Sequence, residues 1–416
     1  NLFLSSILAV DADTGAYRWH YQTTPRDRWD YTATQQITLA DLPLGEDGAN
    51  RRVVMQAPKN GFFYVLDAAD GELISATPFT AQNWTTGQFD ENGRPELVEE
   101  AVDLALYAVV PGPTGAHNWH PMAFNPDTGL VYIPVNEIPF FYDKTRNVED
   151  SKSFWNIGYD AAAGWPVEYP AGTLDAVRDL DGGSLLAWDP VKAEPRWAVP
   201  FPLPLNGGVL STQAGLVFQG NKFGEFVAYD AETGERLWAD KLVGNAAAAP
   251  MTYEIDGEQY LSVLSGWGSV SSLIAGFTYG EAKSKEPARV ITFKLGGDGD
   301  MPAALVDNVV RTPQSPMFGE PDQHQLGMQR YAESCHFCHG AFAVGGGVVP
   351  DLRWSALAGN EQAWDLVVRE GALEKQGMVS FAGRLSKEDT DAIRAYVVQQ
   401  AWLAVANGDA LPPQDG

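Results

Sequence analysis

The chain has 416 residues, an apolar fraction of 45% and a formal net charge of −26. This length and apolar fraction suit two or three globular domains, and the negative charge disfavours nucleic acid and anionic membrane surfaces as partners. No apolar run reaches the roughly 18 residues that a membrane span needs. The start NLFLSSILAV lacks the basic residues of a signal peptide, so we expect the leader of an exported form to lie upstream of Asn1.

A short motif recurs in the first part of the chain. The segment AVDADTGAYRW from Ala9 returns almost intact as AYDAETGERLW from Ala228, and weaker copies begin at Val65, Ala123 and Ala187. In the clearest copies, a strand of alternating apolar residues meets an Asp-x-x-Thr-Gly turn, and a second strand follows. The repeated acidic or amide positions are Asp11, Asp67, Asn125, Asp189 and Asp230.

These repeats predict a β-propeller. One four-stranded sheet for each copy is typical of propeller blades, and the recurring tryptophans Trp19 and Trp238 would pack between neighbouring sheets. A stack of hairpins in a β-sandwich is the alternative, but it gives no reason for a tryptophan to recur. We therefore predict an all-β propeller over residues 1–297, which starts in the middle of a blade and contains about five blades.

The composition changes after this region. Residues 298–322 are rich in Pro and Gly without any period, which is typical of a linker. From Gln323 the pattern turns helical, and Ser386-Lys-Glu-Asp389 resembles a capping box that opens the last helix. The apolar face of that helix would consist of Ile393, Tyr396, Val397 and Ala401. We predict a small all-α domain over residues 323–416.

Both cysteines of the chain lie in the stretch SCHFCHG, at Cys335 and Cys338, directly before His339. This spacing matches covalent attachment of a c-type haem, with the histidine as an iron ligand. A zinc site, a redox dithiol and a local disulfide are the alternatives, but four zinc ligands within five consecutive residues cannot surround one tetrahedral ion. The α/β pattern of a thioredoxin-like motif is also absent. We predict haem c in a cytochrome c domain, and a periplasmic location because such haems are attached outside the cytoplasm.

The haem iron needs a second axial ligand. Met378 is the only methionine after the haem motif and lies in the stretch GMVSF, just before the last predicted helix. A methionine more often fills a core than binds a metal, but this position and uniqueness favour a ligand. Ligation by Met378 and His339 would raise the reduction potential and suit electron transfer.

Together, the propeller turns and the haem motif resemble the quinohaemoprotein alcohol dehydrogenases, relatives of methanol dehydrogenase with eight-bladed propellers that use pyrroloquinoline quinone (PQQ) and calcium. The resemblance covers the whole chain, and its most specific segments are residues 23–36, 56–67 and 115–126 and the haem motif. It implies periplasmic oxidation of alcohols to aldehydes or ketones. Electrons would pass through the haem to an external acceptor such as a soluble cytochrome, a blue-copper protein or a quinone.

The resemblance assigns roles to Asp30 and Lys59. Asp30, between Trp29 and Tyr31, would be the catalytic base that takes the alcohol proton, and it would also reach the calcium. Without the family, Asp30 is either a turn residue or a base whose pKa is raised by partial burial. A lysine at the position of Lys59 approaches the quinone oxygens, where a fixed cation stabilises the reduced cofactor. Without the family, Lys59 would be a surface residue.

Three further positions would contact PQQ by the same resemblance. Asn118 and Trp119 place an amide and a flat ring side by side, and backbone near Val270 touches the cofactor; without the family these are ordinary loop and core positions. Leu205 departs from the tryptophan of many relatives, which weakens the match at one pocket wall. Thr32 stands where lanthanide-using relatives carry a second aspartate, so calcium, which takes oxygen ligands, is the better match.

The front of the chain departs most from the family, which places its other calcium ligands, a disulfide and most PQQ contacts upstream of Asn1. The resemblance therefore implies a fragment or one piece of a cleaved protein. Two other function classes compete with an oxidoreductase: a non-catalytic binding propeller that carries an electron-transfer cytochrome, and a structural envelope propeller. The haem motif disfavours the structural propeller. The conjunction of Asp30, Lys59 and Asn118-Trp119 favours an enzyme over a binding module.

Overall fold

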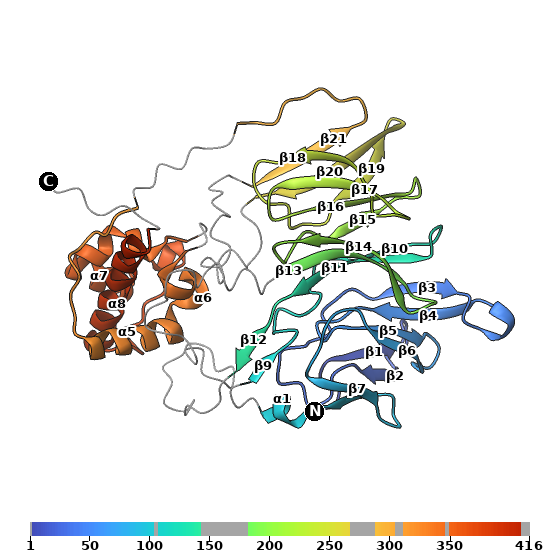
Figure 1. Ribbon diagram of the computed structural model, residues 1–416, viewed down its shortest axis with the longest axis horizontal. Coiled ribbons are helices and arrows are strands. Elements are labelled where there is room, and N and C mark those ends of the chain that lie inside the picture. The colour runs from blue at the N-terminus through green and yellow to red at the C-terminus, as the bar shows by residue number, and fades with distance from the viewer. Residues whose placement is uncertain are drawn as a thin grey trace. The chain divides into compact units, whose positions relative to one another are not determined.

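The computed structural model describes residues 2–103, 107–142, 182–266, 288–303, 311–345 and 349–408 (Figure 1). Contacts define two units, one with most of the strands and one with the C-terminal helices. Among the described residues, no helix combines the length and the apolar character that a membrane span requires. The linker and domain limits drawn from composition stay predictions.

Among the described residues, the strand unit contains three four-stranded antiparallel sheets, whose strands pair in chain order. Their members are β3 (Thr38–Leu42), β4 (Arg51–Gln56), β5 (Phe62–Asp67) and β6 (Leu73–Pro78); β10 (Ala123–Asn125), β11 (Leu130–Glu137), β13 (Gly182–Asp189) and β14 (Glu194–Phe201); and β15 (Val209–Ser211), β16 (Leu216–Gly220), β17 (Glu225–Asp230) and β18 (Arg236–Lys241).

Smaller elements complete the described part of this unit. A three-stranded sheet is formed by β19 (Met251–Ile255), β20 (Glu258–Ser265) and β21 (Arg289–Lys294). Two-stranded sheets pair β1 (Ser6–Val10) with β2 (Tyr17–Gln22), β7 (Thr85–Phe89) with β8 (Pro95–Leu97), and β9 (Tyr107–Val109) with β12 (Phe140–Tyr142). The short helices are η1 (Glu46–Gly48) and α1 (Glu99–Asp103).

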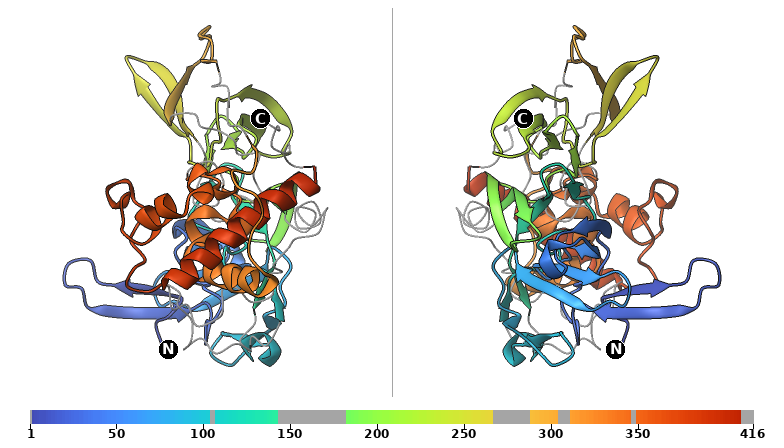
Figure 2. Two further views of the ribbon diagram at one scale, coloured as in Figure 1. Left: turned by 90° about the vertical axis from the view of Figure 1, so that its left-hand side faces the viewer. Right: turned by 90° about the vertical axis from the view of Figure 1, so that its right-hand side faces the viewer.

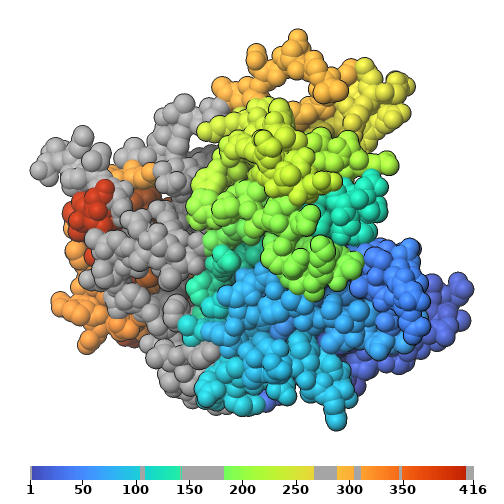
Figure 3. Space-filling model, turned by 45° about the vertical axis from the view of Figure 1, so that its right-hand side comes forward, coloured from blue at the N-terminus to red at the C-terminus, as the bar shows by residue number. Residues whose placement is uncertain are grey.

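Successive sheets pack face to face. Apolar side chains of β4, β5, β11 and β13 form one shared layer. Those of β11, β13, β16 and β17 form the next layer. Phe226 of β17 and Val263 of β20 belong to a third layer. In the space-filling view, the green to yellow atoms of residues 182–266 lie above the blue atoms of the first sheets (Figure 3). Alternating apolar residues on each strand therefore cover both faces of an inner sheet, as in propeller blades.

The repeated tryptophans pack against the turns of neighbouring sheets. Trp19 of β2 donates its indole N–H to the carbonyl oxygen of Ala68 (3.2 Å) and lies over Gly71. Trp197 of β14 donates to Ala231 (3.1 Å) and lies over Gly234. Trp238, by contrast, meets the ring of Phe293 in β21, with ring centroids 5.3 Å apart. The predicted packing between sheets is confirmed for Trp19, whereas Trp238 contacts a ring of the next sheet but stays 40% exposed.

The prediction of one blade for each copy of the turn motif was wrong for the copies at Asn125 and Asp189. The turn at Asn125 joins β10 to β11, and the turn at Asp189 joins β13 to β14 of the same sheet. The sheet of β19 to β21 turns instead at Asp256, without the motif. A side chain that accepts backbone N–H groups suits any hairpin and does not specify its place in a sheet. The number of blades stays a prediction.

The second unit is helical. It contains α5 (Pro321–Ser334), α6 (His336–His339), η3 (Ala341–Ala343), η4 (Leu352–Trp354), η5 (Ala356–Gly359), α7 (Glu361–Val368), η6 (Glu374–Gln376) and α8 (Lys387–Ala406). Helix α5 begins within the predicted linker, because Pro321 suits the first helical turn, where no N–H is required. Helices α5 and α8 cross (Figure 2), and a Cβ at Gly327 would lie 2.1 Å from the carbonyl oxygen of Ala392.

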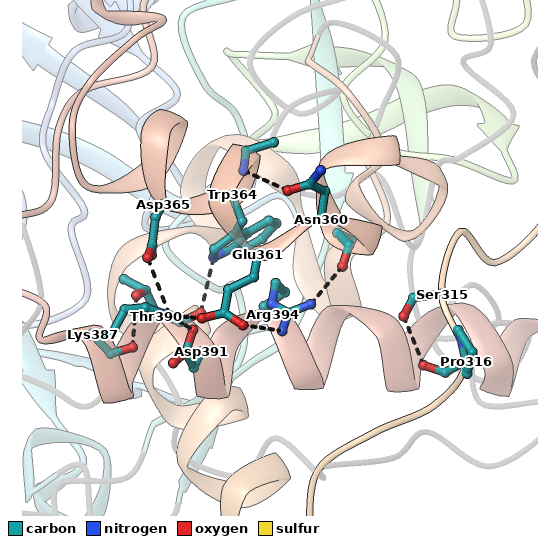
Figure 4. A network of polar contacts seen from close by, with 12 residues as sticks. Ser315, Pro316, Asn360, Glu361, Trp364, Asp365, Lys387, Thr390, Asp391 and Arg394 are labelled. Carbon is teal, nitrogen blue, oxygen red and sulfur yellow. Dashed lines mark hydrogen bonds and ion pairs between the residues drawn. The ribbon is translucent and has the colours of Figure 1, made fainter.

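Helix α8 starts as predicted. Ser386 and Asp389 form a capping box, and the predicted apolar face of this helix is buried. Figure 4 shows how α7 is tied to the start of α8: the ammonium of Lys387 lies 2.8 Å from Glu361 and 3.3 Å from Asp365. Beneath these exposed ion pairs, Trp364 donates to the carbonyl oxygen of Thr390 (3.1 Å).

Candidate functional site

Asp30 and Lys59 form an ion pair between two loops. Asp30 follows β2, and Lys59 lies between β4 and β5. The Nζ atom of Lys59 is 3.0 Å from Oδ2 of Asp30, yet the Lys59 side chain is 9% exposed and that of Asp30 is 64% exposed. The buried ammonium of Lys59 is thus paired with a carboxylate, that of Asp30, which is open to solvent.

The expected partial burial of Asp30 was wrong. Oδ1 of Asp27 accepts the backbone N–H groups of Trp29 (3.0 Å) and Tyr31 (3.1 Å), which forms a tight turn around Asp30. Asp30 itself adopts a positive φ of 64°, while both aromatic side chains are fully buried. The turn therefore directs the carboxylate away from its aromatic neighbours, and the residue order alone does not show this.

Lys59 is covered by a loop that is distant in sequence. A Cβ at Gly115 would lie 2.3 Å from Cγ of Lys59, so only glycine permits this approach. The N–H of Ala116 donates to the carbonyl oxygen of Lys59 (2.8 Å). Asn60 anchors the other side by donating to the carbonyl oxygen of Thr23 (3.0 Å). These contacts bury the lysine that the sequence alone would place at the surface.

Asn118 and Trp119 lie in the loop before β10. The Asn118 amide donates to the carbonyl oxygen of Thr114 (2.6 Å) and accepts the N–H of Trp119 (2.8 Å), so it braces its own loop. The Trp119 side chain is 52% exposed. Its ring stacks on His120, with centroids 4.1 Å apart and planes at 21°. A large aromatic surface is therefore presented outward with an imidazole behind it.

Sequence reasoning missed the histidines on either side of this pair. His117 and His120 are buried, and burial is the main cause that lowers the pKa of His120 to about 3. The signal was available, because the segment GAHNWHP carries both residues. Val270 lies outside the described residues. Leu205 is buried with φ of 59°, and its N–H donates to Asn136 (2.7 Å).

The haem motif lies at the junction of α5 and α6. Cys335 is buried and Cys338 is exposed, and no disulfide joins them. Burial raises the pKa of the Cys335 thiol to about 12, which is opposite to the lowered pKa of a redox-active dithiol. Nδ1 of His339 lies 3.0 Å from the carbonyl oxygen of Pro350. A proton on Nδ1 leaves Nε2 free to bind a metal. A hydrogen bond from the other ring N–H to a carbonyl oxygen is the usual second contact of a ligating histidine.

Met378 lies between η6 and α8, in the predicted loop. Its N–H donates to the carbonyl oxygen of Leu373 (3.2 Å), and its side chain packs, partly buried, against the apolar cluster that includes Cys335 and Tyr396. The structure thus brings Met378 and the haem motif to one apolar core. For calcium, no three His, Cys, Asp or Glu side chains converge within the part of the chain that the structure describes.

Two protein families match this chain. The family described as glucose/ethanol/alcohol dehydrogenase, β-propeller domain, matches residues 1–82 and 75–261. The family described as cytochrome c oxidase, cbb3-type, subunit III, matches residues 322–397. The chain belongs to the quinohaemoprotein alcohol dehydrogenase family. Its fold class is confirmed as a PQQ-type β-propeller domain with a cytochrome c domain.

Relatives of known sequence in this family include a quinohemoprotein alcohol dehydrogenase, ADH IIB, of Pseudomonas putida, which is 44% identical over 97% of this chain and 57% of that protein. The quinohemoprotein alcohol dehydrogenase of Comamonas testosteroni is 40% identical over 95% of this chain and 55% of its own length. The chain therefore spans somewhat more than half the length of these relatives.

Solved structures of the family agree with the fold. The quinohemoprotein alcohol dehydrogenase ADHIIG from Pseudomonas putida superposes with a TM-score of 0.89 at 42% identity, covering 98% of this chain and 60% of that one. The Comamonas testosteroni enzyme gives a TM-score of 0.81 at 38% identity, covering 96% of this chain and 58% of that one.

Proposed function

We propose that the protein oxidises alcohols to aldehydes or ketones with PQQ in the periplasm and passes the electrons through haem c to an external acceptor. The observation that carries this proposal is the ion pair between buried Lys59 and exposed Asp30. The quinohaemoprotein relatives support it. A binding propeller that only carries a cytochrome has no need for an exposed carboxylate held by a buried ammonium.

Asp30 is the proposed catalytic base. Its exposed carboxylate is able to accept the hydroxyl proton of an alcohol, while the ion pair with Lys59 keeps Oδ2 in place. When bound, PQQ supplies the acceptor for the hydride that leaves the alcohol carbon. Lys59 provides a fixed positive charge where negative charge develops on the cofactor oxygens.

Trp119 offers an exposed flat ring on which a planar cofactor is able to stack. Asn118 holds the loop of that ring through its bonds to Thr114 and Trp119, in addition to the cofactor contact that the family implies. A backbone contact near Val270 stays a prediction. These residues suit a planar, anionic cofactor: a cation, an aromatic surface and a carboxylate base.

Calcium is proposed with Asp30 as one ligand. Calcium takes six to eight oxygen ligands, and the described residues form no group of three or more His, Cys, Asp or Glu side chains that could hold a metal ion. The family implies further oxygen ligands in addition to Asp30.

Electron transfer is proposed through a haem bound covalently by Cys335 and Cys338, with His339 and Met378 on the iron. The Pro350 carbonyl beside Nδ1 of His339 supports this assignment, because it leaves Nε2 for the metal. The acceptor is proposed to be a soluble cytochrome, a blue-copper protein or a quinone.

The test is haem reduction driven by an alcohol. Full-length protein matured in a periplasm and loaded with PQQ and calcium should reduce its own haem when a primary alcohol is added, as followed by haem absorbance. The same protein without PQQ is the control. A protein that carries PQQ and haem but leaves the haem oxidised with every alcohol tried would contradict the proposal.

A further inference from the structure

His117 is fully buried, and both of its ring nitrogens face backbone carbonyl oxygens. Nδ1 lies 2.6 Å from the carbonyl oxygen of Ala57, and Nε2 lies 2.7 Å from that of His120. Ala57 precedes the Pro58-Lys59 turn, and His120 follows Trp119. The imidazole therefore bridges the loop that carries Lys59 and the loop that carries Trp119.

The backbone of His117 reaches the third loop. Its carbonyl oxygen accepts the side-chain N–H of Gln35 (3.0 Å), which belongs to the segment after Asp30. The carbonyl oxygen of Gln35 in turn accepts the side-chain N–H of Gln56 (2.8 Å), at the end of β4. Both glutamines are buried. One buried hydrogen-bond network thus joins the segments of Asp30, Lys59 and Trp119.

The charge state of His117 sets how this network is satisfied. A neutral imidazole carries one N–H, so the neutral ring donates to one of the two carbonyl groups at a time. Burial lowers the pKa of His117, and its bonds to Ala57 and His120 act in the opposite direction. His120 and Lys222 both become cations when protonated, and Lys222 lowers the pKa of His120. Neither residue supplies a negative charge that would stabilise a protonated His117. The ring is therefore neutral at neutral pH.

The ion pair between Asp30 and Lys59 does not fix these loops by itself. One partner is 64% exposed, and ion pairs in contact with water contribute little to stability. Buried hydrogen bonds between loops are costly to break, because a polar group is then left unpaired away from water. The buried hydrogen-bond network therefore determines the geometry of the ion pair between Asp30 and Lys59.

We propose that His117 is a positioning residue that holds the loops of Asp30, Lys59 and Trp119 in one arrangement. His117 is 0% exposed and so does not touch substrate or cofactor. Its catalytic consequence rests on the proposed function, whereas its effect on the loops does not.

The test is amide hydrogen exchange in the full-length protein without PQQ, followed by mass spectrometry of peptides that cover residues 27–36, 56–62 and 114–122. His117→Phe keeps a ring but removes the N–H that bonds to one of the two carbonyl groups, and also the polar nitrogen that faces the other. Exchange should rise about tenfold in all three peptides, as expected when a bond worth about 1.4 kcal/mol is lost from the closed state. His117→Gln keeps an N–H donor and should show a smaller rise, and it decides the test if His117→Phe does not fold.

Tyr132→Phe is the matched control. Tyr132 is also fully buried and donates its hydroxyl to the carbonyl oxygen of Ala231 (2.9 Å), but it does so between sheets. This variant should leave exchange in the three loop peptides unchanged. An equal rise in Tyr132→Phe, or a rise confined to residues 114–122 in the His117 variants, would overturn the proposal.

A second readout separates this inference from the proposed function. In PQQ-loaded protein, His117→Gln should lower kcat more than it raises KM, while chemical reduction of the haem stays normal. Protein that does not oxidise any alcohol would refute the proposed function, and the exchange result would still decide the role of His117. Unchanged kcat despite faster exchange in the loops would show that the arrangement held by His117 is not the one that catalysis needs, and would overturn its positioning role in the reaction.

Discussion

The ammonium of Lys59 lies 3.0 Å from the carboxylate of Asp30, and the two partners differ sharply in exposure, at 9% and 64%. The cation belongs to the core and the anion to the surface. This arrangement holds the carboxylate that we propose as the base at the protein surface without enclosing it.

Lys59→Met tests the ammonium. Methionine keeps an unbranched stem against Gly115 but removes the charge, so we expect kcat to fall about 100- to 1,000-fold with primary alcohols, the usual cost of one electrostatic stabiliser. Lys222→Met is the matched control, because Lys222 is equally buried and precedes Asp230 at the spacing by which Lys59 precedes Asp67. An equal loss in both variants would show a general effect of removing a buried charge.

Part of the site could be predicted from sequence because it depends on local order. The capping box at Ser386, the haem motif and the tryptophan at the end of a repeat are all defined within a few residues. The burial of Lys59 could not be predicted, because Gly115 covers it from a distant loop. Turn chemistry also misled: the Asn125 motif looks like the others but joins different strands of its sheet.

The exposure of Asp30 illustrates the same limit. Two aromatic neighbours in sequence suggested partial burial, but a positive φ turned the side chain outward. The segment GAHNWHP shows that His117 and His120 lie close together in sequence, but it does not show the contacts that give His117 its role. Its importance follows from two carbonyl groups, one of which, that of Ala57, lies far away in sequence.

Gly234→Ala tests the packing between sheets. A Cβ there would lie 2.7 Å from the ring of Trp197, and φ is +74°. We expect destabilisation of about 2 to 4 kcal/mol, combining a left-handed backbone with overpacking. Gly215→Ala is the control, because φ is +78° but no atom lies within 4 Å. Scanning calorimetry should show the larger loss for Gly234→Ala, and equal losses would mean that Trp197 yields without cost.

The buried His120 predicts a fall in stability at acidic pH. Burial, with smaller effects of His117 and Lys222, lowers its pKa from the ordinary 6.5 to about 3. The unfolded chain therefore binds a proton near pH 6.5 while the folded chain does not, so stability is complete above about pH 6.5 and declines toward pH 3. The loss is on the order of a few kcal/mol. The melting temperature of His120→Gln should fall less steeply with acid than that of the native chain, and parallel curves would contradict this origin.

Met378→Ala tests the second haem ligand. We expect loss of the weak far-red absorption of oxidised haem with a sulfur ligand, and a lower reduction potential. Met317→Ala, at an exposed methionine of the same unit, should change neither. Persistence of the far-red band in Met378→Ala would assign the ligand to another residue.

The most direct test of the account is Asp30→Asn in full-length protein loaded with PQQ and calcium. Asparagine keeps the size and one oxygen acceptor but loses the basicity, so kcat with primary alcohols should fall on the order of 100- to 10,000-fold, with a smaller change in KM. Bound PQQ, measured by its absorbance, should be largely retained, and chemical reduction of the haem should be normal. Near-native kcat in the PQQ-loaded variant would contradict the role of Asp30 as the base, and loss of PQQ itself would show that Asp30 acts by holding the cofactor site together.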